Sequence, residues 1–197
     1  AAKRAYRFRR LPITPDQERQ FEAEGRPFAL RFQVPSGRLL TLPDQVKGPV
    51  EFHTQEIGDF VIVRPDGTPL YNFASVVDDI DMKITHVVRA EEHLSNTFPQ
   101  LLLFEALGAD LPAFAHIPYV AEPGSKAKLS KRKTGDYAGK GVLVMLHQYV
   151  EKGYLPEAMM NYLSRLGWSY DDTQEVFERD ELIAKFTIER VNSSPAS

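Results

Sequence analysis

Apolar and polar residues alternate in F-A-L-R-F-Q-V, residues 28–34. This period is typical of a strand with one buried face. Its buried face would carry Phe28, Leu30, Phe32 and Val34. A second strand is predicted at 60–64, and it leads into Pro65-Asp66-Gly67, residue types that favour a tight turn. A mixed run follows at 70–77. The first third of the chain is therefore predicted to be rich in strands.

The pattern changes at T-H-V-V-R, residues 85–89, a short apolar strand followed at once by a helical pattern. Thr97 is expected to cap that helix, with Pro99 in its first turn and Gly108 at its end. Strand, turn and helix in this order form the unit of an α/β sheet, whose ligands bind beyond the carboxyl ends of the strands. The polar residues expected at that edge are Arg89, Glu91, Glu92 and His93.

The last third is predicted to be helical. Apolar residues recur at helical spacing over 142–150, and Gly153 ends the segment. Pro156 opens another helix that Gly167 ends. The positions expected to be buried are Met159, Met160, Leu163 and Leu166, with Trp168 and Tyr170 packing below them. Residues 178–186 predict one further short helix.

Composition limits the class of protein. The chain has 197 residues, 43% of them hydrophobic, which suits one large domain or two small ones. It has no cysteine, which excludes disulfides and thiolate metal sites and favours a cytoplasmic setting. No apolar run is long enough to cross a membrane, so no membrane partner is expected. The net charge of -3 argues against a protein that coats nucleic acid indiscriminately.

Positive charge is nevertheless concentrated in two places. Five cations lie within residues 126–133, between glycines. Such lysines can stabilise a nucleoside triphosphate attacked at its α-phosphate, although the charge count alone favours a solvated charge run. The segment lacks the Walker pattern. A second cluster interleaves Tyr6 and Phe8 with cations, which suits phosphates and stacked bases, or a solvated chain end. Its cations are Lys3, Arg4, Arg7, Arg9 and Arg10.

Candidate metal ligands are weak. Asp78 and Asp79 could bind magnesium or act as acid and base, but on a strand they would face opposite ways, and a turn or sheet-end role fits them better. The histidines at 86, 93 and 116 are too scattered to form a ligand set and are more typical of hydrogen-bonded structure. No metal site is predicted.

Four blocks of sequence carry a resemblance to a known family. They are residues 71–97 (Y-N-F-A-S-V-V-D-D-I-D-M-K-I-T-H-V-V-R-A-E-E-H-L-S-N-T), H-I-P-Y-V from 116, K-L-S-K-R-K-T-G from 128, and G-Y-L-P-E-A-M-M-N-Y-L-S-R-L-G-W from 153. Over nearly the whole chain they resemble bacterial-type glutamyl-tRNA synthetases. K-L-S-K-R is similar to the second signature of class I synthetases, Lys-Met-Ser-Lys-Ser.

The resemblance implies an α/β fold: the second half of a class I nucleotide-binding (Rossmann-like) fold, with part of an α+β acceptor-binding insertion and a helical stem-contact region. The boundaries it implies are 1–70 for the insertion, 71–122 for the nucleotide fold, and 123–197 for the lysine loop and stem-contact region. The first signature, His-Ile-Gly-His, does not occur in the sequence. We therefore expect an internal fragment that is inactive alone, exposes surface and self-associates, cut from a monomeric parent.

The resemblance also implies residue roles. Charge in the transition state would be stabilised by the catalytic residues Lys128 and Lys131. The ATP site would comprise Glu92, His93, Tyr119, Val120, Lys128, Ser130, Lys131 and Arg132. Glutamate would be bound by Tyr71, Ser75 and Arg89. The expected tRNA contacts are Arg7, Arg9 and Arg10. Position 75 is often Asn in the family, which weakens the role of Ser75.

The implied reaction joins glutamate to ATP, bound with Mg²⁺ as a substrate complex, to form glutamyl-adenylate, and then transfers the glutamyl group to the 3′ end of tRNA. No zinc is expected in this segment. The implied partners are ATP, L-glutamate and tRNA(Glu), with tRNA(Gln) left open. Two alternatives stay open: a non-catalytic tRNA-binding or regulatory module, and a paralogue of the glutamyl-queuosine tRNA type. Glutaminyl specificity is less favoured by the form of the lysine signature.

Overall fold

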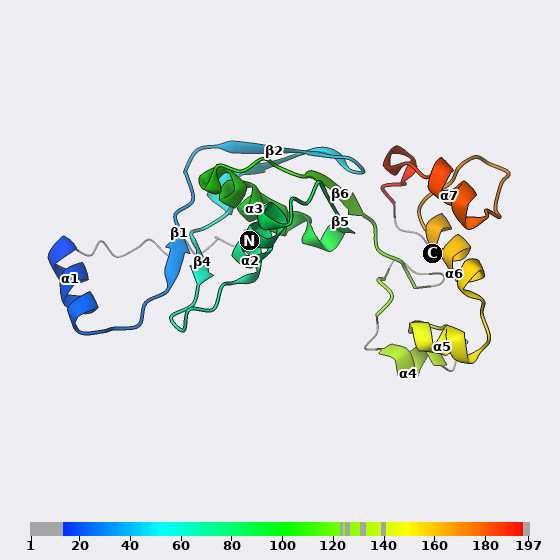
Figure 1. Ribbon diagram of the computed structural model, residues 1–197, viewed down its shortest axis with the longest axis horizontal. Helices are drawn as coiled ribbons and strands as arrows, with labels where there is room; N and C mark the ends of the chain where they lie inside the picture. The colour runs from blue at the N-terminus through cyan, green and yellow to red at the C-terminus, as the bar shows by residue number, and fades with distance from the viewer. Residues whose placement is uncertain (1–13, 123, 125–126, 131–132, 139–140, 195–197) are drawn as a thin grey trace. The chain divides into compact units, whose positions relative to one another are not determined.

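The computed structural model describes residues 14–122, 124, 127–130, 133–138 and 141–194 (Figure 1). The described residues form two compact units. The first contains the described residues up to Asp44, Gly48–Val87 and Glu92–Phe114. The second contains Gln45–Lys47, Val88–Glu91 and the described residues from Ala115 onward. The boundaries expected from the family, 1–70, 71–122 and 123–197, stay a prediction.

The first unit opens with helix α1, Pro15–Ala23. Thr14 and Gln17 form a capping box, in which each side chain bonds the other residue's backbone N–H, and Pro15 occupies the first turn. Strand β1, Leu30–Phe32, pairs antiparallel with β4, Phe60–Val63. Both strands were predicted, although β1 is shorter than the alternation suggested. The expected burial of Phe28 and Leu30 was wrong, since 66% and 48% of their surface is exposed.

A hairpin of β2, Leu39–Asp44, and β3, Gly48–His53, follows β1, and the 3₁₀ turn η1, Thr54–Glu56, ends it. Alternate residues of β2 are buried, the expected pattern for a strand with one face on a core.

Helix α2, Tyr71–Asp81, occupies the mixed run and continues past it. Its apolar positions Phe73, Val76 and Ile80 contribute to the core. Asp78 and Asp79 therefore lie on a helix, and their expected placement on a strand or turn was wrong. Their neighbours recur at helical rather than alternating spacing, so the two carboxylates point about 100° apart.

Strand β5, His86–Ala90, the 3₁₀ turn η2, Glu91–His93, helix α3, Leu94–Leu107, and strand β6, Ala113–Ile117, form one crossover unit. β5 and β6 are neighbours in a sheet, and the Ala113 N–H donates to the Thr85 carbonyl at 2.9 Å. That bond joins the residues at the start of both strands, so the strands are parallel. The predicted strand, turn and helix order is confirmed.

The expected start of α3 was wrong, because the helix begins at Leu94, before Thr97 and Pro99. Thr97 lies inside it, and its hydroxyl donates to the His93 carbonyl at 3.4 Å. The helix ends at Gly108 as predicted; its φ of 67° is a left-handed conformation that glycine adopts without strain.

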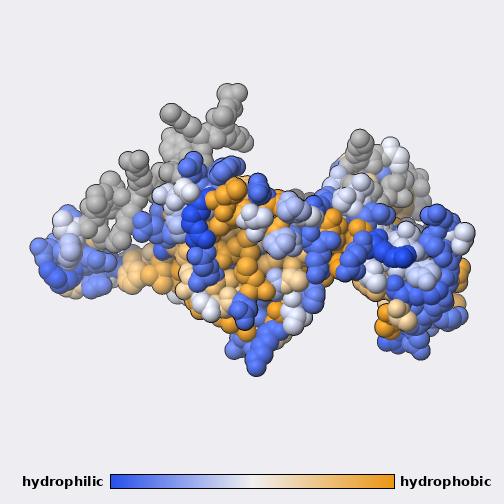
Figure 2. All heavy atoms as spheres, turned by 90° about the horizontal axis from the view of Figure 1, so that it is seen from above, coloured by the Kyte–Doolittle hydropathy of each residue, from blue (hydrophilic) through white to orange (hydrophobic). Residues whose placement is uncertain are grey.

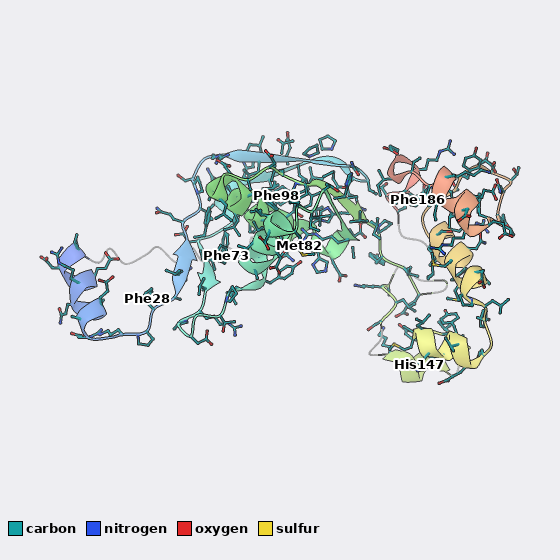
Figure 3. All side chains as sticks on the ribbon, in the orientation of Figure 1. Phe28, Phe73, Met82, Phe98, His147 and Phe186 are labelled. Carbon is teal, nitrogen blue, oxygen red and sulfur yellow. The ribbon has the colours of Figure 1, made fainter. Side chains whose placement is uncertain are left out.

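The core of the first unit lies between α2, α3, β6 and the β2–β3 hairpin (Figure 1). Phe73 and Phe98, labelled in Figure 3, belong to it, and the Phe98 ring stacks on Phe52 at 4.7 Å. The most deeply buried apolar side chains are Leu42, Val76, Phe98, Leu102, Leu103 and Phe104.

The second unit contains α4, Thr134–Ala138, α5, Leu146–Glu151, α6, Pro156–Arg165, α7, Arg179–Lys185, and the 3₁₀ turn η4, Ile188–Arg190. Trp168, Phe177 and Leu182 form its small core, and the Phe186 ring lies 5.5 Å from Trp168 (Figure 3). The helix starting at Pro156 and the short helix near 178–186 are confirmed. The helix expected from 142 begins at Leu146 instead.

The predicted burial of Met160 and Leu163 was wrong, since 55% and 50% of their surface is exposed. Within the second unit, α6 is held through polar groups: the Asn161 amide bonds the backbone of Glu175 and Phe177, and Arg165 pairs with Glu175. Met159 and Leu166, at the other predicted positions, are half-buried. Helical periodicity thus predicted the helix correctly. It could not predict how far each apolar position of the helix is covered by other parts of the chain.

Large apolar side chains are exposed on both units, and Figure 2 shows apolar surface between hydrophilic regions. Those with 66% or more of their surface exposed are Phe28, Met82, Leu146, Val150, Leu155, Val176 and Ile183. The expected self-association stays a prediction. Within the described residues, no helix is both long and apolar enough to cross a membrane.

Candidate nucleotide and amino-acid site

In the first unit, the structure brings together Tyr71, at the start of α2, and His93, just before α3. Their ring centroids are 6.4 Å apart. The Asn96 amide nitrogen lies 3.3 Å from His93 Nδ1, and Glu92 lies 3.9 Å from His93 Nε2. A position expected to bind glutamate and two expected to bind ATP are thus neighbours.

Ser75 belongs to a buried polar group in the same unit. The Gln100 side chain, 2% exposed, donates to Asn72 Oδ1 at 3.3 Å and contacts Ser75 Oγ at 3.5 Å. A buried amide needs such partners, because leaving it unpaired costs about 1–3 kcal/mol. Gln100 therefore connects α3 to the α2 face that carries Ser75.

In the second unit, Arg89 and His116 are joined by a hydrogen bond. Arg89 Nε donates to His116 Nε2 at 3.2 Å. Arg89 is the last but one residue of β5 and His116 the last but one of β6, so both side chains belong to the carboxyl ends of neighbouring parallel strands. His116 is fully buried. Arg89 is thus at the edge where α/β sheets bind ligands.

The chain beyond β6 forms a short antiparallel ladder that supports the lysine segment. The Leu129 N–H donates to the Val120 carbonyl at 2.9 Å, and the Glu122 N–H donates to the Ala127 carbonyl at 2.7 Å. Ala121 and Lys128 are paired in this ladder. Tyr119 is half-buried beside it, whereas the Lys128 side chain is exposed.

A second contact anchors the same segment from its C-terminal side. The buried Tyr137 hydroxyl, on α4, donates to Glu122 Oε1 at 2.6 Å and accepts the Ser130 N–H at 3.3 Å. Lys133 pairs with the same Glu122 oxygen at 3.1 Å. The hydrogen bond to Glu122 raises the pKa of Tyr137, and the same carboxylate raises the pKa of Lys133. The Tyr137 hydroxyl thus links Ser130 to Glu122.

Several expected site residues lie outside the described part of the chain: Arg7, Arg9, Arg10, Lys131 and Arg132. Their roles stay predictions. Among the residues that the structure describes, no group of three or more His, Asp or Glu side chains is arranged to hold a metal ion.

Sequence reasoning missed the supporting residues. These are Asn72, Asn96, Gln100, His116, Glu122 and Tyr137. The sequence alone favours a structural role for His116, and its contact with Arg89 depends on the pairing of two strands, since the two residues are 27 positions apart. The one available signal was its position at the end of the apolar run A-F-A-H-I, matching that of Arg89 in H-V-V-R-A.

A parallel strand–helix–strand crossover with polar residues at its carboxyl edge, followed by a tethered basic loop, defines an α/β protein of the nucleotide-binding type. The family model described as "tRNA synthetases class I (E and Q), catalytic domain" matches residues 1–197, and the chain belongs to this family.

The individual proteins that the chain resembles are glutamate–tRNA ligases. The chain is 47% identical over 191 residues to a glutamate–tRNA ligase of Halalkalibacterium halodurans, covering 97% of this chain and 38% of the relative. It is 47% identical over 184 residues to that of Carboxydothermus hydrogenoformans, covering 93% and 36%. A crystal structure of a glutamate tRNA ligase from Elizabethkingia meningosepticum, in complex with its amino acid, matches with a TM-score of 0.85 and 36% identity, over 93% of this chain and 38% of that chain. The chain thus spans somewhat more than a third of the length of these relatives.

Proposed function

We propose that this chain is part of a glutamate–tRNA ligase. The enzyme would join the glutamate α-carboxylate to the α-phosphate of ATP with release of pyrophosphate, and would then pass the glutamyl group to the 3′ end of tRNA. The observation that carries the proposal is the Arg89 guanidinium, held at the carboxyl edge of the parallel strands by the buried His116.

Arg89 suits the selection of a side-chain carboxylate. A guanidinium and a carboxylate form two parallel charged hydrogen bonds, whereas the neutral amide of glutamine offers one acceptor and two N–H donors that would face the cation. A site built around such a pair rejects the analogue that cannot form it. Tyr71 and Ser75 are proposed to complete the glutamate site.

ATP, with Mg²⁺ as part of the substrate complex, is proposed to occupy the nucleotide site. Glu92 and His93 would line it, and the backbone at Tyr119 and Val120 would contact the base. The ladder and the Tyr137 contact orient the lysine segment, in which Lys128, Ser130, Lys131 and Arg132 would face the phosphates. Lysines placed there would stabilise the charge that develops on the transferring phosphoryl group.

The RNA partner is proposed to be tRNA(Glu), bound in part by the basic N-terminal cluster. Aminoacylation assays with purified tRNA(Glu) and tRNA(Gln) would decide whether tRNA(Gln) is also a substrate. We place the activity in the cytoplasm, in keeping with the cysteine-free sequence.

The test is pyrophosphate exchange into ATP, measured with tRNA present, on the protein expressed from its complete coding sequence. Exchange should require glutamate and should not occur with glutamine. Arg89→Gln should lower kcat/KM for glutamate about 100-fold or more, because a charged bidentate contact is worth about 3 kcal/mol or more. The matched control is Arg165→Gln, an arginine that also holds a partner, Glu175, and it should leave kcat/KM unchanged.

Two outcomes would overturn the proposal. One is full activity in Arg89→Gln. The other is tRNA binding by the complete protein without any amino-acid-dependent exchange, which would favour the non-catalytic tRNA-binding module. The 197-residue chain assayed alone should form no glutamyl-tRNA, because it lacks the His-Ile-Gly-His signature.

A further inference from the structure

We propose that Lys47 is a positioning residue: by binding Glu91 it holds the η2 turn, Glu91–His93, which carries two of the proposed ATP contacts. This inference rests on the proposed function. It starts from one ammonium group that contacts two other segments of the second unit. Lys47 Nζ donates to Glu91 Oε2 and, at 2.7 Å, to the Ser193 carbonyl.

The β2–β3 hairpin places Lys47 for these contacts. Asp44 pairs with Gly48, so Lys47 is the last residue of the turn between the two strands. Its backbone is therefore fixed by paired residues on either side of the turn. The side chain is only 17% exposed, and an ammonium group has three donors with which to bind a carboxylate and a carbonyl together.

The second partner, Ser193, belongs to a segment that is tied to the small core of the second unit. The Asn192 N–H donates to the Gly167 carbonyl at 2.7 Å. Val191 pairs with Trp168, which is buried in that core. The lysine thereby links the end of β5 to an anchored part of the second unit.

Glu91 is the residue at which β5 passes into η2. The strand before it is held by its pairing with β6, whereas η2 is a single 3₁₀ turn, a structure whose hydrogen bonds have poorer geometry than those of an α-helix. A side-chain anchor at the first residue of the turn therefore limits the movement of the two residues that follow. These are Glu92 and His93, and His93 also caps α3.

The burial of the Lys47–Glu91 pair separates it from an ordinary surface ion pair. The two side chains are 17% and 24% exposed. Those of the Arg38–Glu105 pair are 41% and 58% exposed, and such pairs contribute little because water and salt screen them. When one partner of a shielded pair is removed, the charge that remains is better solvated outside. In Lys47→Met the Glu91 carboxylate is therefore expected to turn toward solvent and to displace η2.

The experiment measures pyrophosphate exchange, with tRNA present, in variants of the protein expressed from its complete coding sequence. Lys47→Met and Glu91→Met should each raise the KM for ATP about tenfold, the effect of losing one charged hydrogen bond. The KM for glutamate should change less than about threefold, because Arg89 lies within β5, whose pairing with β6 remains. Lys47→Arg retains a charged donor and should keep the KM for ATP within about threefold of wild type.

The double variant, Lys47→Met with Glu91→Met, separates this pair from every other contact that Lys47 makes. If the two side chains act through each other, the KM for ATP should be raised about tenfold in the double variant, and not the roughly hundredfold that two independent effects would give. The matched control is Lys185→Met. Lys185 also lies in the second unit and binds Glu181 and Gln174 oxygens, both at 2.7 Å, and its loss should leave the KM for ATP unchanged.

A measurement on the wild-type protein does not depend on the folding of variants. Reductive methylation followed by mass spectrometry should modify Lys47 more slowly than Lys152, which is exposed. Adding ATP should slow the reaction at Lys47 further and leave that at Lys152 unchanged. This follows from linkage, because a contact that favours ATP binding must itself be favoured when ATP is bound.

The outcomes separate the two proposals. Wild-type protein without glutamate-dependent exchange overturns the proposed function and this inference with it. An active wild type in which the single effects multiply, or in which Lys47→Met leaves the KM for ATP unchanged, overturns the role of Lys47 alone. Equal reactivity of Lys47 and Lys152, or no effect of ATP on Lys47, overturns it as well, even if none of the variants folds.

Discussion

Phe98→Ala is the sharpest test of the first unit's core. Only 1% of the Phe98 surface is exposed, and its ring stacks on Phe52 at 4.7 Å with 19° between the planes. Removing a buried Phe side chain forfeits about 1.5–3 kcal/mol of transfer free energy. The lost ring contact adds about 0.5–1.5 kcal/mol. With the cavity left behind, the free energy of unfolding should fall by about 3–5 kcal/mol.

The matched control is Phe28→Ala, which deletes the same atoms from a side chain that is 66% exposed (Figure 3). Its effect should stay within about 0.5 kcal/mol. Urea unfolding of the 197-residue chain, followed by far-UV circular dichroism, gives both values as midpoint shifts at a common slope. Trp168 fluorescence follows the other cluster separately.

The reasoning would be refuted by equal losses in the two variants, or by a Phe98→Ala loss below about 1 kcal/mol. Either result would mean that the crossover helix α3 is not packed as described. A changed slope in Phe98→Ala would instead indicate an altered denatured state, and the comparison would then use the temperature midpoint.

Three further predictions follow from single contacts. Gly108→Ala should lower the free energy of unfolding by about 1 kcal/mol, since φ is 67° and no neighbouring atom obstructs a Cβ; an unchanged urea midpoint would contradict this. The hydrogen bond from Arg38 holds the pKa of Glu105 below its ordinary value of 4.5, so the stability it contributes is present above pH 4.5 and is lost as the pH falls through the lowered pKa. At pH 7 the urea midpoint of wild type should therefore be higher than that of Glu105→Gln. This difference between the midpoints should disappear as the pH falls through the lowered pKa of Glu105. A difference that does not change with pH would exclude this linkage. Tyr137→Phe should raise the KM for ATP several-fold in the complete protein and leave the KM for glutamate unchanged, because the Ser130 N–H in the lysine segment loses the Tyr137 hydroxyl that accepts it and that donates to Glu122. Pyrophosphate exchange measures both constants.

The crossover could be predicted from sequence because its signals are strong and local. A short apolar strand leads directly into a long helical pattern, and Gly108 marks the helix end. The start of α3 was harder, because a proline is common in a first turn and Pro99 lies further inside the helix than that rule allows.

Other elements gave ambiguous signals. The mixed run that became α2 is short, and periodicity alone does not separate short apolar strands from helices. The β2–β3 hairpin carries Pro43 opposite Pro49, residues that argue against paired strands, and its turn lacks the Asn-Gly or Asp-Gly signal.

Site residues could be proposed from sequence where one residue carries the chemistry, but the residues that contact them could not. Arg89 and Lys128 could be proposed from the quoted blocks, since a guanidinium and an ammonium suit carboxylates and phosphates. Their supports, His116 and Tyr137, depend on the register of strands and loops that are distant in sequence.

The ladder between Val120 and Leu129 makes one backbone amide a natural reporter of the loop. When the lysine segment separates from the strand that precedes it, the Leu129 N–H loses its 2.9 Å partner and meets solvent. Its rate of exchange with deuterium would then measure how often the segment opens. Slower exchange on adding ATP would show, at a single atom, that nucleotide keeps the segment paired with Val120.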